Sequence, residues 1–131
     1  MTEFPLKERY YDCAGNKLEF VIDNIHLGDS YLVVATEVTN SNREGYEFSS
    51  LSYSIAQALG NVRKKINEGI STKYLSLDPT CLSLSTDIAK GRITDNGLVI
   101  DGTLVSFEQV QDILAVYTGF EIELKIKDKG E

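Results

Sequence analysis

The single histidine of the chain, His26, is the first residue to consider for chemistry, because imidazole can carry a proton or bind a metal near neutral pH. It lies between Ile25 and Leu27, beside an expected turn at Gly28-Asp29. A catalytic histidine needs a nucleophile, a carboxylate or metal ligands close to it in space, and no pattern in the sequence selects such partners. We therefore interpret His26 as a structural or incidental residue.

Two aspartates at the ends of a short expected strand, Asp95 and Asp101, could share a cation or act as an acid and a base. Each stands at a turn that contains glycine, Asn96-Gly97 after the first and Gly102 after the second. Aspartate is common at such turns because its side chain hydrogen-bonds to nearby backbone N–H groups. The conformational role is the stronger interpretation for both residues.

The sequence contains none of the familiar catalytic motifs. It has no Gly-x-Ser-x-Gly elbow, no His-Glu-x-x-His pair, no phosphate-binding glycine loop and no dinucleotide fingerprint. The two cysteines, Cys13 and Cys81, are far apart and form no Cys-x-x-Cys pair, so neither a zinc site nor a redox motif is indicated. We expect no catalytic, cofactor-binding or metal-binding residue, and we lean against an enzyme.

The charge of the chain restricts the class of partner. The net charge is −7 over 131 residues, and an acidic surface repels phosphate backbones and anionic lipids, which disfavours nucleic-acid and membrane partners. No apolar run is long enough for a membrane span or a signal peptide, so we expect a cytoplasmic location. The basic trio Arg63, Lys64 and Lys65 is interpreted as helix-end cations, because the exposed carbonyls there favour positive charge.

Two helices are expected to form one layer of the fold. The longer is predicted at residues 48–68, where apolar residues recur at spacings of three and four, with Gly69 as its stop. The apolar residues of this helix are Phe48, Leu51, Ile55, Leu59, Val62 and Ile66. The shorter helix is predicted at residues 107–118, where Ser106 and Gln109 fit a capping box.

Strands are expected to form the other layer. A hairpin is predicted around Ala14-Gly15-Asn16, and another around Asn96-Gly97. The last predicted strand, residues 120–127, alternates apolar and charged residues and is expected to be half buried. We predict an α+β fold in one domain spanning residues 1–131, with a mainly antiparallel sheet and both helices on one of its faces.

The strand predicted at residues 31–39 is apolar on both faces. One face carries Leu32, Val34 and Val38, and the other carries Tyr31, Val33 and Ala35. Such a strand is usually central in its sheet, or another segment or chain covers its outer face. Because tyrosine is favoured at interfaces, Tyr31, Val33 and Ala35 are the candidate interaction surface, for a homodimer or another protein partner.

Two stretches of the chain resemble an uncharacterised bacterial domain family. The first is Gly45-Tyr46-Glu47-Phe48, which leads into the long helix and its basic turn. The second begins at Val99-Ile100-Asp101-Gly102 and continues through Ser106-Phe107-Glu108 and Tyr117-Thr118-Gly119-Phe120 to the last strand. Together they cover about two thirds of the chain. The resemblance implies an α+β architecture and no established activity.

The leading hypothesis is a small, non-catalytic intracellular domain that acts through a protein contact or through self-association. One alternative is an acidic inhibitor or immunity-type protein that binds a basic surface of a nuclease or toxin. The other is an enzyme whose site is assembled from unremarkable residues, such as His26 with a carboxylate.

Overall fold

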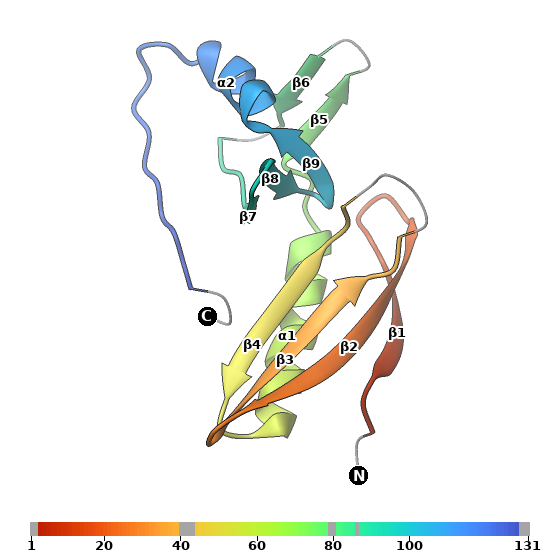
Figure 1. The fold of residues 1–131 in the computed structure, drawn as a ribbon. Coiled ribbons are helices and arrows are strands. Elements are labelled where there is room, and N and C mark those ends of the chain that lie inside the picture. The colour runs from red at the N-terminus through yellow and green to blue at the C-terminus, as the bar shows by residue number, and fades with distance from the viewer. Residues whose placement is uncertain (1–2, 40–43, 79–80, 86, 129–131) are drawn as a thin grey trace.

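The first half of the chain is built on an antiparallel sheet whose strands follow sequence order (Figure 1). The computed structural model describes residues 3–39, 44–78, 81–85 and 87–128. The sheet contains β1 (Leu6–Tyr11), β2 (Lys17–Leu27), β3 (Ser30–Glu37) and β4 (Glu47–Ser52). Gly15 and Gly28 have positive φ in the turns that join the first three strands, a conformation that glycine adopts without steric cost. The predicted turns at both places are confirmed.

Helix α1 (Ile55–Ile70) covers one face of this sheet (Figure 1). The buried side chains of α1 and those of β2 and β3 form a single apolar cluster, which is the larger core of the molecule. Its fully buried members include Phe20, Ile22, Val33, Val62 and Ile66. The apolar residues that recur every three or four positions on α1 therefore form the face of the helix that the sheet covers.

The prediction that the long helix begins at residue 48 is wrong. Residues 47–52 form β4, in which Phe48 pairs with Ala35 of β3, and the helix begins only after Ser54. The side chain of Ser54 accepts a hydrogen bond from the Gln57 backbone N–H at 3.3 Å and so caps the helix. The spacing of Phe48 and Leu51 fits a helix only by coincidence. In the structure the two residues lie on opposite faces of β4, which pairs with β3.

The second half of the chain contains two small antiparallel sheets and one helix. The strands are β5 (Leu75–Asp78) and β6 (Cys81–Leu84) in one sheet, and β7 (Gly91–Thr94), β8 (Gly97–Ile100) and β9 (Thr103–Ser106) in the other. Helix α2 (Phe107–Ala115) follows directly, and its predicted capping box is confirmed, since Ser106 and Gln109 bond to each other's backbone N–H. A smaller buried cluster contains Leu75, Ile100, Val105 and Ile113.

The α+β class and the antiparallel pairing are confirmed, but the expectation of one sheet with both helices on one face is wrong. Helix α1 contacts β3 and β4, whereas α2 contacts β6, β8 and β9, so each helix covers a different sheet. The Gly45 N–H donates a hydrogen bond to the Gly102 carbonyl at 2.8 Å, and the Arg92 side chain donates to the Gly45 carbonyl at 3.1 Å, so both bonds join the halves. The single domain over residues 1–131 stays a prediction.

The last predicted element is not a strand in this structure. Residues 120–127 follow α2 as an extended run that leaves the smaller sheets and pairs with no other described strand (Figure 1). All eight residues are exposed, so the expected half-burial is wrong as well. Within the described ranges, no helix combines the length and the apolar character needed to cross a bilayer.

Candidate interaction surfaces

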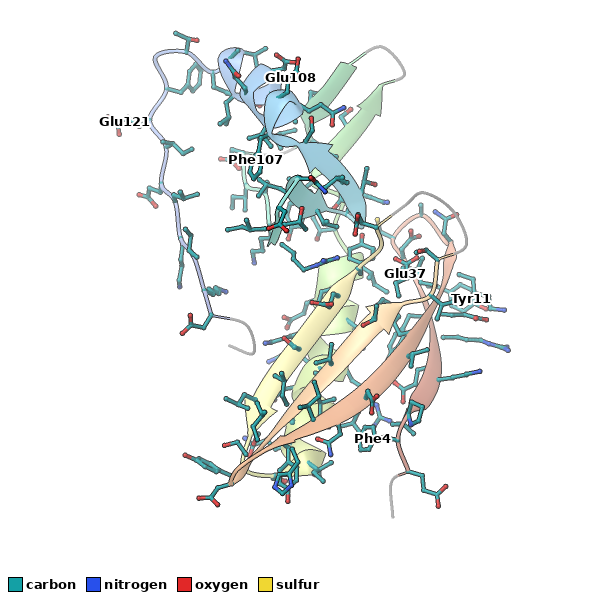
Figure 2. All side chains as sticks on the ribbon, in the orientation of Figure 1. Phe4, Tyr11, Glu37, Phe107, Glu108 and Glu121 are labelled. Carbon is teal, nitrogen blue, oxygen red and sulfur yellow. The ribbon has the colours of Figure 1, made fainter. Side chains whose placement is uncertain are left out.

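The C-terminal segment, residues 120–127, contains four exposed large apolar side chains. Every second side chain is large and apolar, and these are between 69% and 81% exposed. They are Phe120, Ile122, Leu124 and Ile126. Their neighbours are charged and exposed too, as the free position of Glu121 illustrates (Figure 2). Because successive side chains of an extended chain point to opposite sides, the segment has one apolar and one charged face.

A second exposed apolar feature lies on the face of the first sheet that α1 leaves uncovered. The strand register places Ile25 of β2, Leu32 of β3 and Leu51 of β4 side by side across the sheet. We call these three residues the outer row. Ile25 and Leu51 are 46% and 48% exposed, and Leu32 is half-buried between them. Such a row on an open sheet face is the usual position of a contact with another surface.

The candidate surface taken from the sequence, Tyr31, Val33 and Ala35, is not an exposed surface. Val33 and Ala35 are completely buried in the cluster that β3 forms with α1. Tyr31 is half-buried and stacks on His26, with the two rings 4.7 Å apart and nearly parallel. β3 is apolar on both sides as predicted, but the outward side is the one that carries Leu32 and Val34.

The turn between β2 and β3 determines which side of β3 faces the core, because the turn sets the register of the two strands. A two-residue turn at Gly28-Asp29 pairs Leu27 with Ser30 and, further along the same ladder, Ile22 with Ala35. Paired residues lie on the same face of a sheet. Since Ile22 belongs to the apolar side of β2, Ala35 and Val33 had to point into the core as well.

His26 is exposed near the end of β2 and does not lie beside a buried acid. The buried carboxylate of β3, Glu37, pairs with Phe20 at the opposite end of the hairpin, about 20 Å away at the usual rise of a strand. Glu37 accepts a hydrogen bond from the Tyr46 N–H at 3.1 Å. The combination of His26 with the buried carboxylate of Glu37 therefore receives no support from the geometry.

The two aspartates considered for chemistry, Asp95 and Asp101, have different surroundings. Asp95 is exposed in the β7–β8 turn. Asp101 is buried, has φ of 55°, and accepts hydrogen bonds from the Tyr74 N–H at 2.9 Å and the Leu75 N–H at 2.8 Å. The Asp101 side chain thus fixes the start of β5, which is a conformational role.

Comparisons with known proteins place the chain among uncharacterised domains. The model of a domain of unknown function, DUF7686, matches residues 2–71, more than half of the chain. The chain belongs to the DUF7686 family. A second domain of unknown function, DUF7713, matches residues 74–131. Neither a curated protein nor a solved structure matches the chain.

Each of the two matches contains one of the two cores and one of the two exposed apolar features. The stretch that matches DUF7686 contains β1 to β4, α1 and the outer row, and it contains every residue of the larger core. The stretch that matches DUF7713 contains the smaller core and the whole C-terminal segment. The C-terminal segment therefore lies within the stretch that matches DUF7713.

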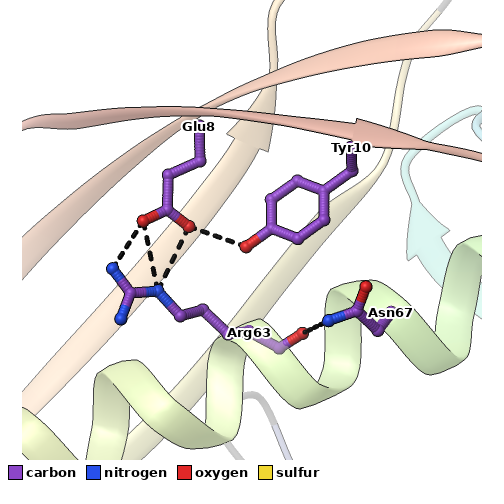
Figure 3. A network of polar contacts seen from close by, with 4 residues as sticks. All are labelled: Glu8, Tyr10, Arg63 and Asn67. Carbon is purple, nitrogen blue, oxygen red and sulfur yellow. Dashed lines mark hydrogen bonds and ion pairs between the residues drawn. The ribbon is translucent and has the colours of Figure 1, made fainter.

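A polar network on the DUF7686 part attaches β1 to α1 (Figure 3). The Arg63 guanidinium donates to both oxygens of Glu8, with Nη2 2.5 Å from Oε2, and the Tyr10 hydroxyl donates to Glu8 Oε1 at 2.6 Å. The hydrogen bond from Arg63 holds the pKa of Glu8 below its usual value. Burial, followed by the bond to Glu8, raises the pKa of Tyr10 to about 12. We interpret this network as structural, because the Arg63–Glu8 pair joins α1 to β1 and Tyr10 supports Glu8 from the same strand.

The basic trio of the long helix does not cap its end, so that prediction is wrong. Helix α1 continues to Ile70, about two turns beyond Arg63. Arg63 binds Glu8, and the Lys65 ammonium donates to the Ser49 carbonyl of β4 at 2.6 Å. Lys64 is exposed and lies 4.0 Å from Glu68. Two of the three cations therefore fasten α1 to the strands.

The part of the chain that the structure describes offers little else for chemistry. It holds no group of three or more His, Cys, Asp or Glu side chains arranged for a metal ion. One open depression of about 270 Å³ is lined by Lys17, Glu19, Glu37 and Val38, and Lys17 lies 3.9 Å from Glu19 in it. The exposed apolar surfaces are the stronger candidates for function.

Proposed function

We propose that this protein is a small protein-interaction domain of the bacterial cytoplasm that acts by contact through its C-terminal segment, with self-association as the leading form. It has no catalytic role in this proposal. The observation that carries the proposal is the exposure of Phe120, Ile122, Leu124 and Ile126 along one face of an extended run. A monomeric protein rarely leaves such a set of side chains in water, because their burial is the main favourable term in association.

The backbone of the segment supports the same proposal. An extended chain outside a sheet leaves its N–H and C=O groups to water, and pairing with another strand would satisfy them. Addition of a strand is a common mode of protein recognition, in which the backbone supplies affinity and alternate side chains supply specificity. A partner strand would thus pair with the extended backbone of residues 120–127 and contact the apolar side chains that alternate along it.

The experiment that tests this function compares the native chain with the double variant Ile122→Asp/Leu124→Asp by light scattering over a range of concentrations. We expect the native chain to exceed its monomer mass of 14.6 kDa and the variant to remain at that mass. Both substituted residues are exposed, so the variant should keep the native fold, which circular dichroism checks. Equal masses for native and variant chains at every concentration would contradict the proposal.

The other two hypotheses have less support. An enzyme site that combines His26 with a buried acid is not formed by this hairpin, because its buried acid, Glu37, lies at the far end. An acidic inhibitor would use carboxylates gathered on one surface, whereas several of the acids here are already engaged within the chain. Glu8 binds Arg63, Asp101 binds backbone N–H groups, and Glu19 lies 3.7 Å from Arg9. The interaction domain is the function that we retain.

A further inference from the structure

We propose that the partner of the C-terminal segment is the same segment of a second copy of this chain, paired antiparallel about a two-fold axis at Leu124. This inference rests on the proposed function and specifies the partner. It starts from the order of charges in the segment, where Glu121 and Glu123 come first and Lys125 and Lys127 follow. An antiparallel copy reverses that order, so acids meet bases.

The register of such a pair is determined by the side chains. Centred on Leu124, the pair places Glu123 opposite Lys125 and Glu121 opposite Lys127, twice each by symmetry. On the other face Leu124 meets its own copy and Ile122 meets Ile126. Cross-strand pairs of opposite charge and of branched apolar side chains both stabilise a sheet, so both faces favour this register.

Neighbouring registers are disfavoured by the same rule. A shift of the centre to Glu123 or to Lys125 places a charged residue opposite its own copy. A centre at Ile122 brings Glu121 against Glu123, and a centre at Ile126 brings Lys125 against Lys127. Like charges directly opposite each other are destabilising, and a shift by one residue would set apolar side chains against charged ones. Only the register centred on Leu124 pairs every charged residue of 121–127 with one of opposite sign.

A ribbon of two strands is marginal in water on its own, so its apolar face must be covered. Helix α2, which precedes the segment, carries further exposed apolar side chains. Phe107, labelled in Figure 2, is 53% exposed, and Leu114 is 44% exposed. The two residues are seven apart, which places them on one side of the helix, and the exposed Val116 follows. Two copies of α2 beside the ribbon would cover its apolar face from both ends.

The first test exchanges charges and measures mass by sedimentation velocity. The variant Glu121→Lys/Glu123→Lys has a wholly basic segment, and Lys125→Glu/Lys127→Glu has a wholly acidic one. We expect each alone to dimerise at least about tenfold more weakly than the native chain, because every charged pair becomes repulsive. A mixture of the two should form a heterodimer, and the chain with all four substitutions should dimerise like the native one.

The second test places a cysteine on the proposed axis. In a chain with Cys13→Ser and Cys81→Ser, the substitution Leu124→Cys brings two thiols face to face in the dimer, and mild oxidation should give a covalent dimer. The matched control is Ile122→Cys, which lies opposite Ile126 of the second copy. Its two thiols are offset by four residues, about 13 Å along the strands, so it should cross-link at least about tenfold more slowly than Leu124→Cys. Equal rates for the two positions would overturn the register.

The outcomes separate this inference from the function on which it rests. If the native chain assembles, Ile122→Asp/Leu124→Asp does not, and both charge variants assemble as the native chain does, the segment binds another surface and the self-pairing is overturned. If the native chain is monomeric at every concentration, the self-pairing is overturned. Recovery of the dimer on mixing the basic and acidic variants supports it, because a general loss of folding could not be reversed by mixing.

Discussion

The carboxylate of Glu8 is a single group that joins a strand to a helix. Its side chain is 22% exposed and that of Arg63 is 45% exposed, so the pair is only partly protected from water and its contribution to stability is moderate. The bidentate geometry and the hydrogen bond from Tyr10 make the contribution of this pair to stability larger than that of an ordinary surface ion pair. The stability that it supplies depends on its remaining ionised.

We predict that Glu8→Gln lowers the free energy of unfolding by about 1 kcal/mol at pH 7. Because Arg63 lowers the folded-state pKa of Glu8 from 4.5, the contribution is fully present above that pH and is lost as the pH falls through the lowered value. The difference between native and variant chains should therefore shrink below pH 4.5. Urea unfolding along a pH series measures it, with Glu3→Gln as the control, and a constant difference at all pH values would contradict the prediction.

The side chain of Asp101 is a second group whose loss should be measurable. We predict that Asp101→Asn destabilises the fold by about 1–3 kcal/mol, because the part-buried N–H of Tyr74 and the buried N–H of Leu75 lose a charged acceptor. Asparagine tolerates positive φ, so the effect reports the carboxylate and not the backbone. The exposed Asp95 supplies the control, Asp95→Asn, expected within about 0.5 kcal/mol of native. Equal unfolding midpoints for the two variants would remove the structural role.

Among the elements, α1 contains two glycines with different surroundings. A methyl group on Gly69 would meet the Phe48 ring at 2.5 Å, whereas one on Gly60 would meet no atom within 4 Å. Gly69 was expected to end the helix, but it lies inside it and allows Phe48 of β4 to approach. The glycine is thus required by packing between strand and helix.

We predict that Gly60→Ala stabilises the protein by about 0.5–1 kcal/mol, since alanine has the higher helix propensity. Gly69→Ala gains the same propensity but forces the Phe48 ring to move, which costs about 1–3 kcal/mol. The two variants should therefore differ in thermal midpoint, with Gly69→Ala the lower. Identical midpoints would mean that the ring moves aside freely.

The elements that the sequence predicted correctly are those whose signal is local. The turns at Gly15 and Gly28, the hairpin of β7 and β8 and the capping box at Ser106 each depend on a few adjacent residues, and the structure contains all of them. The turn of the β7–β8 hairpin is formed by Asp95 and Asn96, one residue earlier than predicted, because Gly97 pairs with Thr94. The start of α1 was misjudged because Phe48 and Leu51 fit two periods, and only the pairing of β4 with β3 decides between them. Pairing is a long-range property.

The prediction of the candidate surface was wrong for the same reason, because the exposed side of β3 also depends on long-range pairing. The prediction of a half-buried strand at residues 120–127 was wrong for a related reason. Val33 and Leu32 are equally apolar in sequence, and the register of β2 with β3 determines which faces α1. For residues 120–127 the alternation is a genuine strand signal, but the described chain contains no strand that pairs with it. Periodicity predicts a conformation without identifying its neighbour.

At the scale of the whole molecule, the larger core lies entirely within residues 1–71, whereas the smaller core has few fully buried side chains. We predict that the fragment 1–72 folds alone and unfolds cooperatively, because it retains the sheet, α1 and their common cluster. Circular dichroism on heating and the dispersion of amide NMR signals measure this. A fragment 1–72 without a cooperative transition would support the single domain over residues 1–131.

The order of charges in the C-terminal segment also bears on a hazard that exposed apolar strands usually carry. In cross-β fibrils identical segments stack parallel and in register, so that each side chain lies on its own copy in the layer above and below. Stacked in that way, residues 120–127 would set glutamate on glutamate and lysine on lysine through the whole fibril. The charge pattern that permits one closed pair thus opposes amyloid growth.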